Sequence, residues 1–174
     1  MSHYLNPKRL NSKRSYYKNL IFIITSFIIK RLLLLGFKNI DYYYVHGEGN
    51  GNKVILGKNV STMDATFNVT CGNITILDNT LLSHDVHLLT GFHRFHEGVL
   101  AKQSKKINAP REVPTSGYDI IIGKGCFIGS RVTILKSVTL GDNVIVAAGS
   151  VVTKSFPNNV FIAGIPAKII RINI

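Results

Sequence analysis

Residues 121–150 read IIGKGCFIGSRVTILKSVTLGDNVIVAAGS, and this stretch decides the fold. Aliphatic residues recur in it at every sixth position, and mostly small residues follow them. An α-helix buries a side chain about every 3.6 residues and a lone strand every second residue, so a period of six fits neither alone. It is typical of a β-solenoid whose six-residue unit is a short strand plus a turn. The rungs of this ladder are Ile122, Ile128, Ile134, Leu140, Val146 and Val152.

A companion column lies four residues after each rung and is also expected to face the interior. The same period occurs upstream, where an earlier unit starts at Leu56 and Val60. The downstream companions are Cys126, Val132, Val138, Val144 and Ser150. The upstream rungs are Ile76, Leu82 and Leu88, with companions Thr80, Val86 and Phe92.

The register of the ladder breaks twice. The interval from Leu88 to Ile122 is 34 residues, five sixes plus four, so residues 93–119 are predicted to form a loop thrown out of the solenoid. A shift of two residues further upstream predicts a smaller insertion near residues 70–73. Long loops without their own structure are usually functional or disordered, and this one is rich in lysine and arginine.

Composition bounds the class of protein. A chain of 174 residues with 45% apolar and 17% charged residues is long and apolar enough for one folded domain. Two cysteines do not make a disulfide framework, and Cys126 is expected to pack in the companion column. Free thiols and the lack of a cleavable signal favour the cytoplasm, with the inner face of the membrane left open.

The net charge of +12 is unevenly placed. Residues 1–40 contain eight lysines and arginines and no acid, giving +8, whereas residues 41–174 have 13 basic and 9 acidic residues, giving +4. Because the solenoid itself is only mildly basic, we expect no nucleic-acid partner.

Residues 1–46 are interpreted as a basic and apolar N-terminal helical segment. Residues 20–37 read LIFIITSFIIKRLLLLGF, and the two cations in the middle disfavour a membrane span. The helix either packs on the end of the solenoid or lies in a membrane interface as a peripheral contact. Residues 47–174 are assigned to the solenoid domain, with the loop 93–119 and a C-terminal tail 156–174.

Four segments resemble motifs of the hexapeptide-repeat acyltransferases. They are the stretch 121–150, the terminal segments AGSVVTK (148–154) and PNNVFIAGIPAKIIR (157–171), and LLTGFHRFHE (88–97). The last is similar to the catalytic stretch of the branch that acetylates sugars, including galactoside, maltose, nodulation-factor and surface-polysaccharide acetyltransferases. The resemblance covers residues 54–171.

The resemblance implies an all-β, left-handed parallel β-helix that assembles as a homotrimer with active sites between subunits. It implies acetyl-CoA as acyl donor, without a metal, and a sugar hydroxyl as acceptor, in surface-polysaccharide synthesis. A hydroxyl needs a base to take its proton as it attacks a thioester, and a histidine suits this role near neutral pH. His93 matches the family's catalytic position, and attack is expected to be direct.

Other site residues follow from the same resemblance. Gly129 and Ser130 are expected to bind the oxyanion near the thioester. Residues expected to bind coenzyme A are Phe127, Ala148, Thr153, Lys154, Lys168 and Arg171. Residues expected to bind the acceptor are Asp64, Asn68, His84 and Asp85. Arg94 departs from the family, which often has aspartate or proline after the catalytic histidine.

Three alternatives stay open. The histidines at 84, 87, 93 and 96 suggest a metal site, but the zinc carbonic anhydrases of similar fold place two histidines in a later coil, which this chain lacks. The chain is alternatively an N-acetyltransferase of a nucleotide-linked amino sugar. From another class, it is a non-catalytic, membrane-associated solenoid scaffold.

Overall fold

The computed structural model describes residues 24–25, 41–101 and 112–172. The chain divides into two compact units, residues 1–40 and 41–174. The predicted N-terminal helix therefore lies outside the described residues, apart from Ile24 and Thr25, which are helical. In the described part of the chain, no helix has the length and apolar character needed to cross a bilayer.

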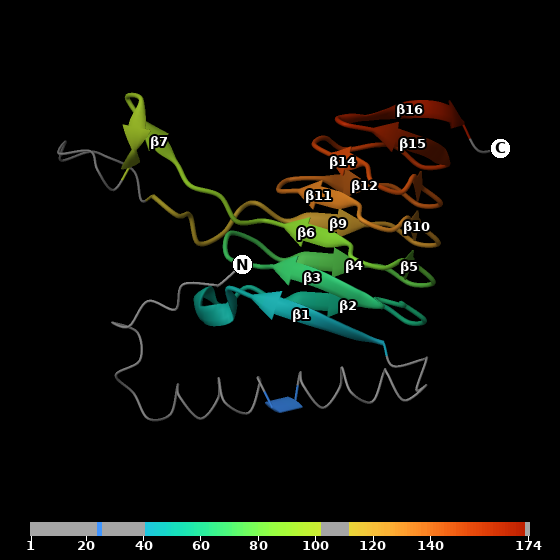
Figure 1. Ribbon diagram of the computed structural model, residues 1–174, viewed down its shortest axis with the longest axis horizontal. Helices are drawn as coiled ribbons and strands as arrows, with labels where there is room; N and C mark the ends of the chain where they lie inside the picture. Colours follow the sequence, from blue (N-terminus) through green and yellow to red (C-terminus); the bar gives the residue numbers. More distant parts are fainter. Residues whose placement is uncertain (1–23, 26–40, 102–111, 173–174) are drawn as a thin grey trace. The chain divides into compact units, whose positions relative to one another are not determined.

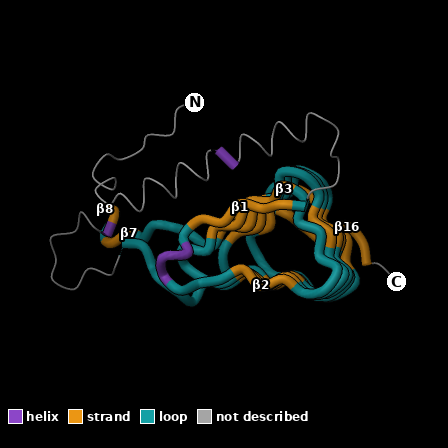
Figure 2. Tube along the Cα trace, turned by 90° about the horizontal axis from the view of Figure 1, so that it is seen from below, coloured by secondary structure: helices purple, strands orange, loops and turns teal. Residues whose placement is uncertain are grey.

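The second unit is a parallel β-helix with three strand-bearing faces (Figure 1). The chain passes repeatedly from face A to B to C, with isolated bridges at Ser61 and Phe156 in place of two strands. The coils superimpose when seen along the stack (Figure 2). Face A contains β1 (Tyr42–His46), β3 (Asp64–Asn68), β6 (His87–Leu89), β11 (Thr133–Leu135) and β14 (Val151–Val152). Face B contains β2 (Val54–Leu56), β4 (Ile74–Ile76), β9 (Ile120–Ile122) and β12 (Thr139–Leu140). Face C contains β5 (Leu81–Leu82), β10 (Phe127–Ile128), β13 (Ile145–Val146), β15 (Val160–Gly164) and β16 (Ala167–Ile172).

Three elements depart from the parallel coils. A 3₁₀ turn, η2 (Glu48–Asn50), connects β1 with β2. β15 and β16 form an antiparallel hairpin at the end of face C. The short strands β7 (Phe95–His96) and β8 (Val99–Leu100) form a second antiparallel hairpin, which stands outside the stack (Figures 1 and 2).

The predicted ladder forms the interior, which confirms the period of six. Each of its six rungs is at most 1% exposed, and the rungs step from face B to C to A twice. Ile134 on β11 lies between Leu88 on β6 and Val152 on β14, so rungs of successive coils stack directly. The downstream companion column is likewise at most 2% exposed.

Gly129 shows why small residues follow the rungs. A Cβ atom at this position would lie 2.6 Å from the backbone nitrogen of Ala148 in the next coil, far closer than real Cβ contacts. Any side chain here would push the two coils apart and break their hydrogen bonds. The close approach of the coils therefore requires glycine at this corner.

The predicted loop 93–119, called the excursion below, leaves the β-helix between β6 and β9, where the register breaks. It contains secondary structure of its own, the β7–β8 hairpin. The smaller insertion lies between β3 and β4, as expected. Phe92 does not join the companion column. It is only partly buried and packs edge-on against Tyr118, with ring centroids 4.6 Å apart.

The start of the solenoid also differs from the prediction. Residues 42–46, assigned from the sequence to the N-terminal segment, form β1 and pair with all five residues of β3. Val45 of this strand packs against the core. The compact unit therefore begins at Asp41 rather than at residue 47.

Two neighbouring isoleucines of β9 provide a matched test of the core. Ile122 is fully buried and Ile121 is 39% exposed on the outer face. Truncating a buried isoleucine to alanine costs about 2–5 kcal/mol. We therefore expect Ile122→Ala to lower the urea midpoint clearly more than Ile121→Ala does. Equal midpoints for the two variants would contradict the inward assignment of the ladder.

Candidate active site

His93 lies where the chain leaves the β-helix, at the corner between faces A and B. Its side chain is 62% exposed, and its Nδ1 lies 2.8 Å from Oε1 of Glu112, whose side chain is only 14% exposed. An ionised carboxylate only accepts hydrogen bonds, so Nδ1 of a neutral His93 is the donor. The Nε2 lone pair of the ring is then left to accept a proton.

Backbone contacts tie the two ends of the excursion together at the same point. The N–H of Arg94 donates to the carbonyl oxygen of Glu112 at 2.7 Å. The N–H of Tyr118 donates to the carbonyl of Cys71 at 3.2 Å, which holds the returning chain on the corner after β3. Glu112 is thus positioned by the loop closure and in turn orients the ring of His93.

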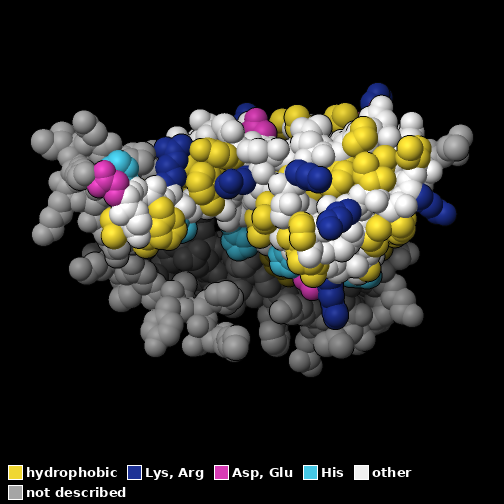
Figure 3. All heavy atoms as spheres, turned by 90° about the horizontal axis from the view of Figure 1, so that it is seen from above, with side chains coloured by type: hydrophobic (Ala, Val, Ile, Leu, Met, Phe, Trp, Pro, Cys, Tyr) yellow, Lys and Arg dark blue, Asp and Glu magenta, His cyan; other side chains and the backbone are white. Residues whose placement is uncertain are grey.

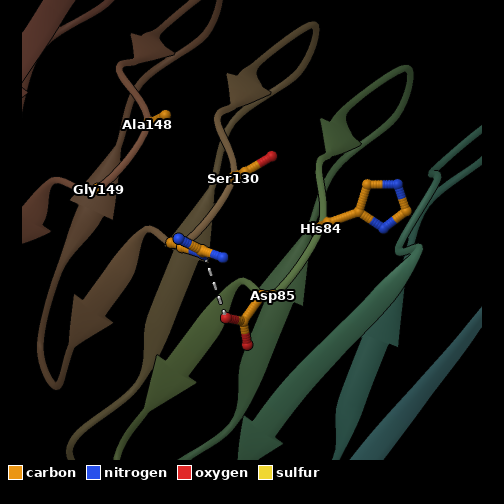
Figure 4. Close-up of a pocket in the computed structure, with 6 residues that line it drawn as sticks. His84, Asp85, Ser130, Ala148 and Gly149 are labelled. Carbon is orange, nitrogen blue, oxygen red and sulfur yellow. Dashed lines mark ion pairs between the residues drawn. The ribbon is translucent and has the colours of Figure 1, made fainter.

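A pocket of about 570 Å³ lies at a different corner, between faces C and A. Ser130 and Ala148 lie on successive coils along this pocket, with Gly149 beside Ala148 and His84 one coil before Ser130 (Figure 4). The hydroxyl oxygens of Ser83 and Ser130 are 2.7 Å apart, so a hydrogen bond joins the two coils. The pocket is lined by His84, Asp85, Ser130, Arg131, Ala148 and Gly149.

Charged side chains gather at one end of this pocket. Nδ1 of His84 is 3.6 Å from Oδ1 of Asp64, and Nε2 of His87 is 3.0 Å from Oδ1 of Asp85. Nε of Arg131 is 3.9 Å from Oδ2 of Asp85, the dashed contact in Figure 4. Because the Arg131 side chain is 83% exposed, this ion pair contributes little to stability and leaves the guanidinium accessible.

The two corners lie at opposite ends of face A. Asp64 begins β3 beside the pocket, and Asn68 ends β3 near the start of the excursion. A strand rises about 3.3 Å per residue, so four steps separate the corners by about 13 Å. Within one chain, His93 and Ser130 therefore do not form one compact site.

Known proteins resemble this chain in sequence and in fold. Residues 119–154 match the family model "Hexapeptide repeat of succinyl-transferase". The chain is 38% identical to galactoside O-acetyltransferase of Escherichia coli K12, over 70% of this chain and 55% of that protein. It is 35% identical to a putative colanic acid biosynthesis acetyltransferase of the same organism, over 68% of this chain and 58% of that protein.

The fold agrees with a solved structure of galactoside acetyltransferase in complex with coenzyme A. The TM-score is 0.57 and the sequence identity 33%, covering 77% of this chain and 61% of that one.

The chain belongs to the hexapeptide-repeat acyltransferases.

Its relatives include members of the sugar O-acetyltransferase branch, and its fold is the left-handed parallel β-helix, both as predicted. The chain spans a little over half the length of the curated relatives it matches.

The residues expected to bind the coenzyme lie on the later coils of this acyltransferase fold. Phe127 is 45% exposed on the outer side of β10. Arg171 on β16 lies over the ring of Phe161 at 5.5 Å, and Nζ of Lys154 is 5.7 Å from the centroid of Phe156. Figure 3 shows the C-terminal end of the stack, where cationic side chains lie among exposed apolar ones. Thr153 and Lys168 are exposed as well.

The oxyanion assignment at Gly129 needs correction. The N–H of Gly129 donates to the carbonyl of Val146 at 2.9 Å, as part of the bonding between coils. That donor is therefore already used. Ser130 lines the pocket, and its hydroxyl keeps a hydrogen to donate when Ser83 is the donor in the bond between the two serines (Figure 4).

The predicted acceptor residues are divided between the two corners. Asp64, His84 and Asp85 lie together beside the pocket, whereas Asn68 accepts a hydrogen bond from the N–H of Thr70 in the turn near the excursion. In the described ranges, no three histidine, cysteine or acidic side chains converge as a metal site would require.

The sequence does not predict two contacts of the site, that of Glu112 with His93 and that of Ser83 with Ser130. Glu112 is 19 residues from His93, across an excursion that follows no period. Ser83 was recoverable, because the stacking register places it one coil before Gly129 and next to Ser130.

Cys126 is packed beneath the outer residues of face C, and burial raises the pKa of its thiol. A raised pKa leaves less of the reactive thiolate at a given pH. We expect iodoacetamide to alkylate Cys126 in the folded protein more slowly at pH 8 than in the unfolded protein, and faster as the pH rises further. Peptide mass analysis follows both states. Equal rates in the two states would contradict the buried placement.

Proposed function

We propose that the protein is an acetyl-CoA-dependent O-acetyltransferase that acts on a sugar hydroxyl, with His93 as the general base. The observation that carries the proposal is the His93–Glu112 pair, at 2.8 Å, in a chain whose relatives acetylate sugars. An imidazole held by a carboxylate on one nitrogen and open to solvent on the other has the geometry of a general base.

In the proposed reaction, Nε2 of His93 takes the proton of the acceptor hydroxyl while its oxygen attacks the thioester carbon. The new C–O bond gives a tetrahedral oxyanion, which collapses with cleavage of the C–S bond. The departing coenzyme thiolate takes the proton from the imidazolium, so the products are the acetyl ester and free coenzyme A. The carboxylate of Glu112 stabilises the imidazolium between these steps.

Donor binding is assigned to the pocket at the other corner. Ser130 offers a hydroxyl to the oxyanion, and Ala148 and Gly149 leave room for the pantetheine arm. Lys154, Lys168 and Arg171, exposed at the C-terminal coils, supply positive charge for the phosphates. Because His93 and Ser130 lie at separate corners, the complete site takes one corner from each of two copies, as in a cyclic homotrimer.

The biological setting is proposed from the relatives. One of them is named for colanic acid biosynthesis. We therefore propose that the acceptor belongs to a surface polysaccharide and that the protein acts in the cytoplasm. The charge of +8 on residues 1–40 supports a contact of this segment with anionic lipids at the inner face of the membrane.

The catalytic assignment is tested by thiol release from acetyl-CoA over a panel of sugars. General-base catalysis contributes roughly 10²–10⁴-fold, so His93→Ala is expected to lower kcat by that factor with coenzyme binding intact. A hydrogen bond to a charged group contributes about 1.5–3 kcal/mol, so Glu112→Gln is expected to lower kcat by about 10- to 100-fold.

His96→Ala is the matched control, because His96 lies in the β7–β8 hairpin outside the proposed machinery, and it is expected to keep normal turnover. Near-normal turnover of His93→Ala would reject the assignment. Release with amino sugars alone would favour N-acetylation, and failure to bind coenzyme A would favour a non-catalytic scaffold.

The shared site is tested by mixing two inactive subunits. His93→Ala removes the base, and Ala148→Trp fills the donor pocket at an exposed position. In a cyclic trimer that contains both variants, one of the three sites combines an intact His93 with an intact pocket. Co-expressed, doubly tagged trimers are expected to recover about a third of wild-type activity. No recovery would mean that each chain builds its own site.

A further inference from the structure

We propose that the acceptor is an acidic sugar, whose carboxylate or phosphate group is bound by Arg94 and Lys136 beside the reacting hydroxyl. The inference rests on the proposed function and names the substrate class of the same site. It follows from two cations that both lie near the ring of Tyr118, where the excursion returns to the β-helix.

Arg94 follows His93 directly and is held in place by its neighbours. Its Nη2 donates to the hydroxyl of Tyr118 at 3.1 Å, and its guanidinium carbon lies 6.0 Å from the centroid of the Tyr118 ring. A guanidinium has five N–H donors in a planar fork that fits a carboxylate or phosphate in a bidentate way. The contact with Tyr118 uses one of these donors and orients the rest.

Lys136 also lies near the Tyr118 ring, but it comes from a different coil. It lies in the turn between β11 and β12, at the corner of faces A and B. Its Nζ is 4.4 Å from the centroid of Phe92 and 5.6 Å from that of Tyr118. Cation–π contacts of this kind hold an ammonium without neutralising its charge. Lys136 and Arg94 therefore share the Tyr118 ring as two positive charges.

Neither cation forms an ion pair with an acidic side chain of the described residues. The carboxylates nearby in the chain have other partners. Glu112 contacts His93, and Oδ1 of Asp119 accepts the backbone N–H of Asn73 at 2.7 Å. Both cations lie within 6.0 Å of the centroid of the Tyr118 ring, so an anion bound beside this ring is attracted by both charges. The site is therefore electrostatically complementary to an anionic group.

The shape beside Arg94 agrees with such a ligand. Arg94, Pro114, Thr115 and Ser116 line a pocket of about 230 Å³, so two hydroxyl-bearing residues face the same space as the guanidinium. The carbonyl of Thr115 accepts a hydrogen bond from Asn52 at 2.8 Å, which fixes this wall to the β-helix. The pocket is smaller than the roughly 300–1,000 Å³ of drug-sized ligand sites, as expected for one substituent of a larger acceptor.

The location separates this anion from the phosphates of the coenzyme. The cations assigned to the coenzyme lie on the last coils, at Lys154, Lys168 and Arg171. Arg94 instead follows the base in the chain, and Lys136 lies over the ring of Phe92, the residue before the base, so both are near where the acceptor hydroxyl must bind to lose its proton. An anion held here fixes the acceptor with one hydroxyl directed at His93.

The test compares three acceptors that differ only at one carbon: methyl galactoside, methyl galactosiduronate and methyl galactoside 6-phosphate. The full-length protein is expected to use the two anionic acceptors with kcat/KM about 10- to 100-fold above that of the neutral one, since hydrogen bonds between charged groups are strong. The ratio of uronate to phosphate identifies which anion the site takes.

Arg94→Gln and Lys136→Gln are each expected to reduce this preference at least several-fold with an unchanged KM for acetyl-CoA. Lys124→Gln, at an exposed lysine of the B–C corner, is the matched control and should change neither quantity. Equal use of all three acceptors by the wild type would overturn the inference while the acetyltransferase stands. A raised KM for acetyl-CoA in both variants would also overturn it, because the cations would then bind the coenzyme.

Should no acceptor be acetylated, the proposed function fails and binding alone decides the inference. Saturation-transfer NMR with methyl galactosiduronate reports binding without catalysis. A signal that is present in the wild type and lost in Arg94→Gln supports the anion site. A signal that is absent from the wild type, or equal in both proteins, overturns it.

Discussion

The rest of this structure depends on a narrow interior that admits two side chains from each six-residue unit, one rung and one companion. Each rung is buried between the rungs of the coils next to it. The backbone hydrogen bonds between coils run along the stack, as in the 3.0 Å contacts from Phe127 N–H to the carbonyl of Val144 and from Ile121 N–H to that of Val138. The interior and the coil bonding together leave little freedom along the strands. Insertions and unusual side chains are therefore confined to the corners, where a turn already interrupts the pairing.

Both functional regions follow from this constraint. The excursion leaves at the corner after β6 and returns before β9, so β4 and β9 still pair as if they were consecutive coils. Its closure brings Glu112 to His93 and Tyr118 to Arg94. The pocket at the other corner needs no insertion, because regular stacking places Ser130 and Ala148 one above the other (Figure 4).

The sequence predicts the periodic part of the molecule well and the rest poorly, for a physical reason. The ladder, the two insertions and the departure of the chain near His93 all follow from counting by six. The Glu112 contact does not, because the return path of an excursion has no period. Phe92 fits the companion column by its spacing, yet it packs on Tyr118, since the coil ends just before it. A motif gives only residue types, so it does not reveal that the N–H of Gly129 is bonded to the neighbouring coil.

Because the two corners are separate, donor binding and acceptor choice depend on different parts of the chain. The donor pocket is built on coil spacing, so a substitution such as Gly129→Ala would force adjacent coils apart and cost stability as well as coenzyme binding. The base, its carboxylate partner and Arg94 instead belong to the excursion, whose residues contribute little to the core. Acceptor choice can then change through exposed loop positions while the β-helix and the donor pocket keep their geometry. A cation beside the base at Arg94 is a change of this kind, because it alters what the site attracts without altering what holds the chain folded.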